Sequence, residues 1–156
     1  MNHYHLDTDY LISFADLFHP NNVRVRSEIM EWTIAGYELC ASSVAWQEFY
    51  SGKSRPRPPE ITAYAKGMLT GGIVQFGEEQ AEKAAELFHQ IGRKKMLVYD
   101  CAIAAAAIVA NAELATFNLD DFKLFVPFGL HIVNFAVLPN SPVPQKSSIT
   151  QRKAVL

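Results

Sequence analysis

Apolar residues recur along this chain with two different spacings, which alternate from the N-terminus to about residue 135. Short runs of adjacent apolar residues predict strands, and apolar residues three or four positions apart predict helices. The predicted strands are residues 4–6, 37–41, 73–76, 114–116 and 131–135. The predicted helices are residues 10–18 and 23–35, a helix starting at Ser42 or Ser43, and residues 61–68, 78–91, 100–110 and 120–125.

Strands that alternate with helices favour parallel pairing in one sheet. We therefore predict an α/β fold, with a central parallel sheet of four to five short strands flanked by helices. The 156 residues suit one domain, which we place at residues 1–138. Residues 139–156 contain Pro139, Pro142 and Pro144 and several basic residues but no acid, which predicts a flexible C-terminal tail.

Composition excludes several classes of protein. Hydrophobic residues make up 49% of the chain and aromatic residues 12%, which is enough for a buried core. The longest apolar run, Cys101 to Ala110, is too short to span a bilayer, and the first residues lack the pattern of a signal peptide. Cys40 and Cys101 form no disulfide framework, so we expect a cytoplasmic protein that does not contact the membrane. The net charge of −2 neither favours nor opposes a nucleic-acid partner.

Acidic residues follow several of the predicted strands or begin the predicted helices. They are Asp7, Asp9, Glu48, Asp100, Asp120 and Asp121, with the amide of Asn118 among them. Each acid alone is readily explained as a helix cap or a first-turn residue. Together, at the carboxyl edge of one sheet, they would repel one another unless a cation were bound. Oxygen ligands suit Mg²⁺ or Mn²⁺, and such an ion serves phosphoryl chemistry.

Four runs of sequence carry a resemblance to a known family. They are HLDTDYLISF, ASSVAWQEFYSG, YDCAIAAAAIVANAELATFNLDDF and GLHIVNF, which together span about residues 4–135. In their order and spacing they resemble a PIN domain, specifically the VapC-type toxin ribonucleases. The matching positions include Leu6-Asp7-Thr8-Asp9, Ser43 through Glu48 to Gly52, Asp100 through Ala105, and Thr116 through Phe122.

The resemblance implies a Mg²⁺- or Mn²⁺-dependent endoribonuclease that is the toxin of a type II toxin–antitoxin pair. It implies a small antitoxin as partner, a homodimer, and RNA as substrate. The implied catalytic residues are Asp7, Glu48, Asp100 and Asp121, with Asp7 and Asp100 as direct metal ligands. Glu48 would bind the metal through water or polarise the attacking water.

The resemblance also implies supporting residues. They are Thr8, Asp9, Asn118 and Asp120. The family usually has Asn where Asp9 stands, and we expect Asp9 to support the loop. Which of Asn118, Asp120 and Asp121 completes the acidic site is left open.

Two groups of basic residues are candidates for contact with RNA phosphates, which would position the strand without reading its sequence. They are Lys53, Arg55 and Arg57 in one loop and Arg93, Lys94 and Lys95 in another. Their alternative role is ordinary solvated surface.

Two other functions fit parts of the sequence. A PIN fold kept only to bind RNA or a protein partner would explain the fold but not the retained acids. A phosphatase of the haloacid dehalogenase type would explain Asp7-Thr8-Asp9 after a strand, but it has no use for Glu48 or Asp100. Metal-dependent cleavage of RNA distinguishes the nuclease from a binding module, and formation of a phospho-aspartate would identify the phosphatase.

Overall fold

The computed structural model describes residues 2–134 of the 156-residue chain. The tail predicted for residues 139–156 and the domain boundary at residue 138 lie outside the described residues. So does Phe135, the last residue of the final predicted strand.

Five parallel strands form one sheet in the described part of the chain, which confirms the predicted α/β class. The strand order is β3-β2-β1-β4-β5, so β1 lies in the centre. In the register, His5 of β1 lies opposite Cys40 of β2 and Leu114 of β4. The strands are β1 (His3–Leu6), β2 (Glu38–Ser42), β3 (Gly72–Val74), β4 (Glu113–Ala115) and β5 (His131–Ile132).

Helices connect the strands. The α-helices are α1 (Thr8–Ala15), α2 (Asn22–Ile34), α3 (Ser43–Ser51), α4 (Pro59–Met68), α5 (Glu78–Gln90), α6 (Val98–Val109) and α7 (Leu119–Phe122). Two short 3₁₀ helices are η1 (Lys95–Leu97) and η2 (Lys123–Phe128). No helix within residues 2–134 has both the length and the apolar character needed to cross a membrane.

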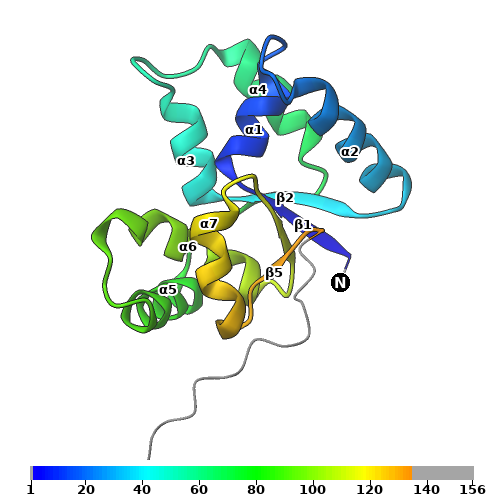
Figure 1. Cartoon of the computed structure of the whole chain (residues 1–156). Helices are drawn as coiled ribbons and strands as arrows, with labels where there is room; N and C mark the ends of the chain where they lie inside the picture. Colours follow the sequence, from blue (N-terminus) through cyan, green and yellow to red (C-terminus); the bar gives the residue numbers. More distant parts are fainter. Residues whose placement is uncertain (1, 135–156) are drawn as a thin grey trace, which may run out of the picture.

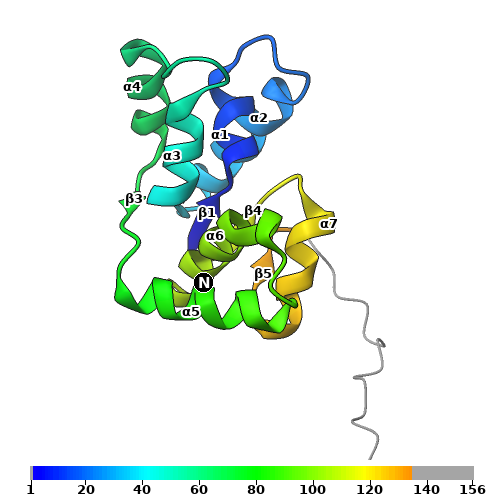
Figure 2. The same ribbon diagram turned by 90° about the vertical axis from the view of Figure 1, so that its left-hand side faces the viewer.

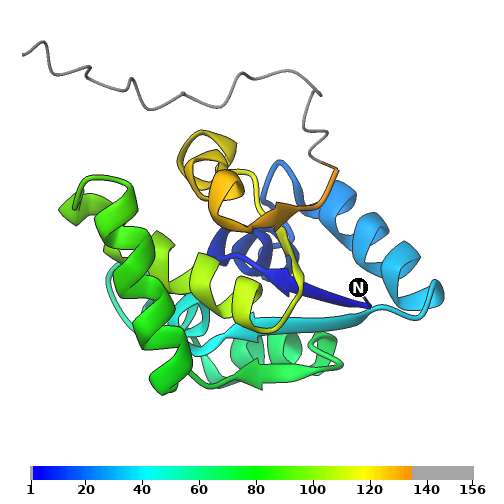
Figure 3. The same cartoon turned by 90° about the horizontal axis from the view of Figure 1, so that it is seen from below.

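The helices cover both faces of the sheet, because successive side chains of a strand point to opposite sides. Tyr4 and Leu6 of β1 belong to a core with residues of α1, α2 and α4. Leu114 of β4 belongs to a second core with residues of α5, α6 and η2. Figures 1 and 2 show α1–α4 in the upper part of the molecule and α5–α7 in its lower part. In Figure 3 the strands run across the centre of the view, with α5 and α6 (green to yellow-green) on the left and α2 (blue) on the right.

Alanines let α6 pack closely against the sheet. Ala104, Ala105 and Ala107 are fully buried in the core of that face. Small side chains allow a close approach of helix and strand backbones, so the first turn of α6, which contains Asp100, is held near the sheet.

The first helix is shorter than the apolar pattern predicts. The pattern continues to Phe18, but α1 ends at Ala15, and Leu17 and Phe18 are 63% and 97% exposed. The buried Asn22 side chain explains this end, because its amide donates to the carbonyls of Ser13 and Phe14 at 2.8 and 3.1 Å. Those carbonyls are among the last of the helix, so the bonds satisfy them and the chain turns.

Candidate active site

The carboxyl ends of the central strands meet at one edge of the sheet. α1 follows β1, α3 follows β2 and α7 follows β4, while α6 begins at this edge before the chain returns to β4. Figures 1 and 2 show the starts of these helices gathered between the upper and lower groups. In open α/β sheets this edge is where ligands bind.

Asp7 stands at the end of β1 and caps α1. Its Oδ1 accepts a hydrogen bond from the backbone N–H of Thr8 at 2.8 Å, and its Oδ2 accepts one from the Thr116 hydroxyl at 2.7 Å. The residue is 5% exposed. Burial, helped by the negative charges of Asp9 and Asp100, raises the pKa of Asp7 to about 8, although the bonds from Thr116 and Thr8 act in the opposite direction.

Asp9 holds the loop between β4 and α7. Its Oδ2 accepts a hydrogen bond from the backbone N–H of Phe117 at 2.9 Å. Burial raises the pKa of Asp9, while the surrounding hydrogen bonds act to lower it. The other carboxylate oxygen, Oδ1, is buried and has no hydrogen-bond partner among the described residues.

Glu48 reaches the edge from the second turn of α3. Ser42 is the N-cap of that helix and stabilises its start, because its hydroxyl oxygen accepts a hydrogen bond from the Ala45 N–H at 3.0 Å. The Thr8 hydroxyl donates to Glu48 Oε2 at 2.6 Å. Thr8 therefore connects the start of α1 to the carboxylate on α3.

Asp100 approaches the same edge from the other side, in the first turn of α6. It is half-buried. Burial and the charges of Asp121 and Glu48 raise the pKa of Asp100 to about 6. The charge of Asp100 thus acts on Asp7, and the charges of Glu48 and Asp121 act on Asp100.

The three polar residues after β4 differ in their surroundings. Asn118 donates its side-chain N–H to Asp121 Oδ2 at 3.0 Å. Asp120, whose side chain is 92% exposed, instead forms an ion pair with Lys123 at 2.7 Å. The hydrogen bond and the positive charge of Lys123 lower the pKa of Asp120. Asp121, not Asp120, is therefore electrostatically linked to Asp100.

The donor set fits a hard divalent cation. Asp7, Asp9, Glu48, Asp100 and Asp121 offer only oxygen, and none forms an ion pair within residues 2–134. As they stand, no three acids, histidines or cysteines in the described part of the chain lie close enough to hold an ion together.

The basic residues lie in two separate regions. The loop of Lys53, Arg55 and Arg57 lies at the far end of α3, whereas Arg93, Lys94 and Lys95 follow α5 in the lower part of the molecule (Figures 1 and 2). The structure does not bring these groups together.

Arg57 and Arg93 also contact neighbouring aromatic rings. Arg57 Nε donates to the Phe49 carbonyl at 2.6 Å, and its guanidinium lies 4.6 Å from the Phe49 ring centroid. Arg93 lies 5.5 Å from the Phe88 ring centroid. Lys53, Arg55, Lys94 and Lys95 are exposed and form no ion pair within residues 2–134.

The sequence did not single out Thr116 as a site residue. Its buried hydroxyl contacts Asp7 at 2.7 Å and lies 3.4 Å from Asp9, and its oxygen accepts the Asn118 N–H at 3.0 Å. The available signal was a polar residue directly after a buried strand, which is the same signal that identified Asp7.

Comparison with known protein families identifies a match over most of the chain. The family model described as "PIN domain" matches residues 4–125. A search of curated proteins found no match.

Solved structures of low sequence identity share the fold. VapBC2 from Rickettsia felis, bound to a promoter DNA fragment, matches with TM-score 0.65 and 22% identity over 86% of this chain and 99% of that chain. FitAcB from Neisseria gonorrhoeae matches with TM-score 0.65 and 18% identity, over 84% and 96%. A toxin–antitoxin complex from Klebsiella pneumoniae matches with TM-score 0.57 and 21% identity, over 76% and 89%.

Proposed function

The chain belongs to the PIN domain family, and from that premise we propose that it is a divalent-metal-dependent endoribonuclease. The observation that carries the proposal is the set of acids at the carboxyl edge of the sheet, which includes the buried Asp7 and has no cationic partner within residues 2–134. An RNA phosphodiester is the proposed substrate, and hydrolysis is the proposed reaction.

Asp7 and Asp100 are the residues proposed to hold Mg²⁺ or Mn²⁺. The bound ion would orient a phosphate oxygen, lower the pKa of a bound water and offset charge in the transition state. The raised pKa values of Asp7 and Asp100, about 8 and about 6, fit this role, because a cation favours the charged form of both carboxyls.

The other side chains have distinct proposed tasks. Glu48 is fixed by Thr8 through Oε2, which leaves Oε1 to accept a proton from the attacking water. Thr116 orients Asp7 through its hydroxyl, and Asp9 holds the loop that carries Thr116. Asp121 is proposed to complete the acidic set, oriented by Asn118.

We further propose that the protein is the toxin of a type II toxin–antitoxin pair and forms a homodimer. The similar folds of VapBC2 and of the Klebsiella pneumoniae toxin–antitoxin complex support the toxin assignment. A physical reason supports it too, since a cluster of unneutralised carboxylates attracts an arginine, whose planar guanidinium pairs with carboxylate in two bonds. An antitoxin segment with such an arginine would displace the metal and block RNA.

A cleavage assay tests the nuclease. The chain should cleave single-stranded RNA with Mg²⁺ or Mn²⁺ and lose this activity in EDTA. Asp7→Asn and Asp100→Asn should lower the rate by several orders of magnitude, while Glu82→Gln, which removes an exposed acid on α5, should not change it. Full activity in EDTA, or in both Asn variants, would refute the proposal.

Expression in a bacterial host tests the toxin role. Induction of this chain alone should stop growth, induction of Asp7→Asn should not, and the protein encoded next to it should co-purify and restore growth. Normal growth with abundant folded protein would instead favour a PIN nuclease without an antitoxin.

Two alternative functions remain to be compared. A non-catalytic PIN module predicts RNA binding without cleavage in the assay above. A haloacid dehalogenase-type phosphatase fits poorly, because its second acid must act on the substrate. Asp9, at that position, is partly buried and accepts a hydrogen bond from the Phe117 N–H.

A further inference from the structure

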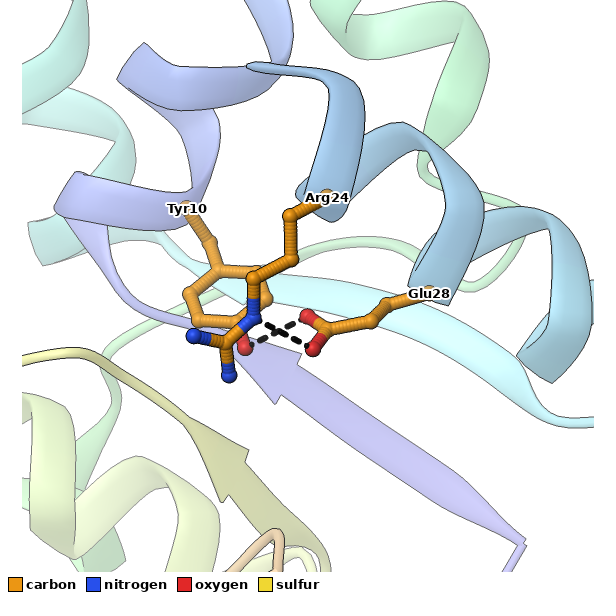
Figure 4. A network of polar contacts seen from close by, with 3 residues as sticks. All are labelled: Tyr10, Arg24 and Glu28. Carbon is orange, nitrogen blue, oxygen red and sulfur yellow. Dashed lines mark hydrogen bonds and ion pairs between the residues drawn. The ribbon is translucent and has the colours of Figure 1, made fainter. Parts of the chain in front are cut away.

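Arg24 is held in one orientation although it lies on the molecular surface. Its side chain on α2 is 62% exposed, and its Nε donates to Glu28 Oε1 at 2.9 Å. The Tyr10 hydroxyl donates to Glu28 Oε2 at 2.9 Å. Each oxygen of Glu28 therefore has a partner, and Figure 4 shows the two terminal nitrogens of Arg24 pointing away from Glu28.

The Phe117 ring gives the guanidinium a second point of support. Arg24 Cζ lies 5.2 Å from the centroid of the ring, and Tyr10 stacks on the same ring at 4.5 Å with an interplanar angle of 14°. A guanidinium that is bonded at Nε and placed over an aromatic ring has lost much of its rotational freedom. The cost of ordering a bound group there is correspondingly low.

Phe117 connects this cation to the loop that carries residues of the candidate site. Its backbone N–H donates to Asp9 Oδ2 at 2.9 Å, and it stands between Thr116, which contacts Asp7, and Asn118, which contacts Asp121. The ring is partly buried and packs against the core under α1 and α2. Arg24 therefore contacts the side chain of a residue whose backbone is bonded to Asp9 of the candidate site.

Stability alone accounts poorly for this arrangement. The ion pair with Glu28, whose side chain is 19% exposed, engages only Nε of Arg24 and leaves the two terminal nitrogens unaccounted for. Terminal guanidinium nitrogens with no hydrogen-bond partner within residues 2–134 are instead free donors. A planar pair of such donors matches the two oxygens of a phosphate.

We propose that Arg24, held by Glu28 and Phe117, binds a backbone phosphate of the RNA next to the one that is cleaved. This rests on the proposed nuclease function and assigns a substrate contact to it. A polyanion that approaches a cluster of carboxylates needs a cation beside the cluster, and Arg24 supplies one in a fixed orientation. Arg24 positions the strand and takes no part in the bond cleavage.

Binding measurements test Arg24 separately from catalysis. We would measure the affinity of the full chain for a fluorescein-labelled single-stranded RNA in the Asp100→Asn background. Arg24→Gln should raise Kd roughly tenfold and reduce the slope of log Kd against log salt by about 0.7, which corresponds to one phosphate contact. Arg26→Gln is the matched control. Arg26 is an exposed arginine on the same helix, and it contacts neither Glu28 nor Phe117. Its replacement should leave Kd within about twofold.

Kinetics of the otherwise unmodified enzyme give the second measurement. Arg24→Gln should raise KM and leave kcat within about twofold, whereas a residue that only supports the fold would lower kcat or the melting temperature. Equal effects of Arg24→Gln and Arg26→Gln, no effect of Arg24→Gln, or no RNA binding by the parent chain would each overturn the assignment. Failure of the parent chain to cleave RNA, with binding still dependent on Arg24, would refute the nuclease proposal and leave the RNA contact standing.

Discussion

Thr116 donates its hydroxyl hydrogen to Asp7 Oδ2 over 2.7 Å, although the two residues are 109 positions apart in the chain. The contact exists because β1 and β4 are neighbours in the sheet, with Leu6 opposite Ala115. The residues that directly follow these two strands therefore meet.

This contact predicts a specific loss of activity in Thr116→Val. Valine has the shape of threonine but no hydroxyl, so Asp7 loses the bond that orients it. Losing an outer-shell partner of a metal ligand typically costs ~10–100-fold in metal affinity or activity. We expect that reduction in kcat/KM, together with a higher Mn²⁺ concentration for half-maximal rate. Thr116→Ser keeps the hydroxyl and should retain most activity; equal losses in both variants would mean that the methyl group matters and the hydroxyl does not.

The two acids of α7 should respond differently to mutation. Asp121 raises the pKa of Asp100 and accepts a bond from Asn118, whereas the exposed Asp120 is paired with Lys123. Asp121→Asn should therefore lower the cleavage rate at least tenfold, and Asp120→Asn should lower it less than about twofold. Steady-state cleavage of one RNA at fixed Mg²⁺ measures both, and the reverse order would assign the site to Asp120.

The metal-free protein should lose stability as the pH rises. The pKa of Asp7 is raised from 3.8 to about 8 by burial and by the neighbouring acids, so the folded state binds more protons than the unfolded state between these values. Stability therefore falls from about pH 4 to about pH 8. In EDTA, Asp7→Asn should make the stability decrease less with pH. It should also raise the melting temperature at pH 8, by ~2–4 °C for each kcal/mol gained in the free energy of unfolding. Melting curves that are equally pH-dependent in both proteins would contradict the burial of an ionisable Asp7.

The loop that carries Lys53 and Arg55 should depend on Gly52. This residue has a φ of 63° at the end of α3, and a Cβ there would collide with the Arg55 carbonyl oxygen. Gly52→Ala should lower the free energy of unfolding by more than about 1 kcal/mol. Gly67 lies within α4 with nothing near its missing Cβ, so Gly67→Ala should raise stability by roughly 0.5–1 kcal/mol. Urea unfolding of the two variants measures the contrast.

The sequence by itself determined the class of fold and the positions of most elements, because hydrophobic periodicity is a local property. All five strands begin within one residue of their predicted starts, and the helices around them begin or end within a few residues of their predicted positions. The acids were recognisable because each directly follows a strand or lies in an early turn of a helix, and the order of the motifs indicated the family.

Only the tertiary structure decided which side chains meet. The order β3-β2-β1-β4-β5 brings residues 7 and 116 together, and nothing in local periodicity specifies that order. The end of α1 at Ala15 depends on a bond from Asn22, on the next helix. Similarly, Arg24 has Glu28 four residues further along its own helix, but its position over the Phe117 ring depends on the tertiary structure alone. Contacts of this kind depend on which segments become neighbours when the whole core packs, so no single segment contains them.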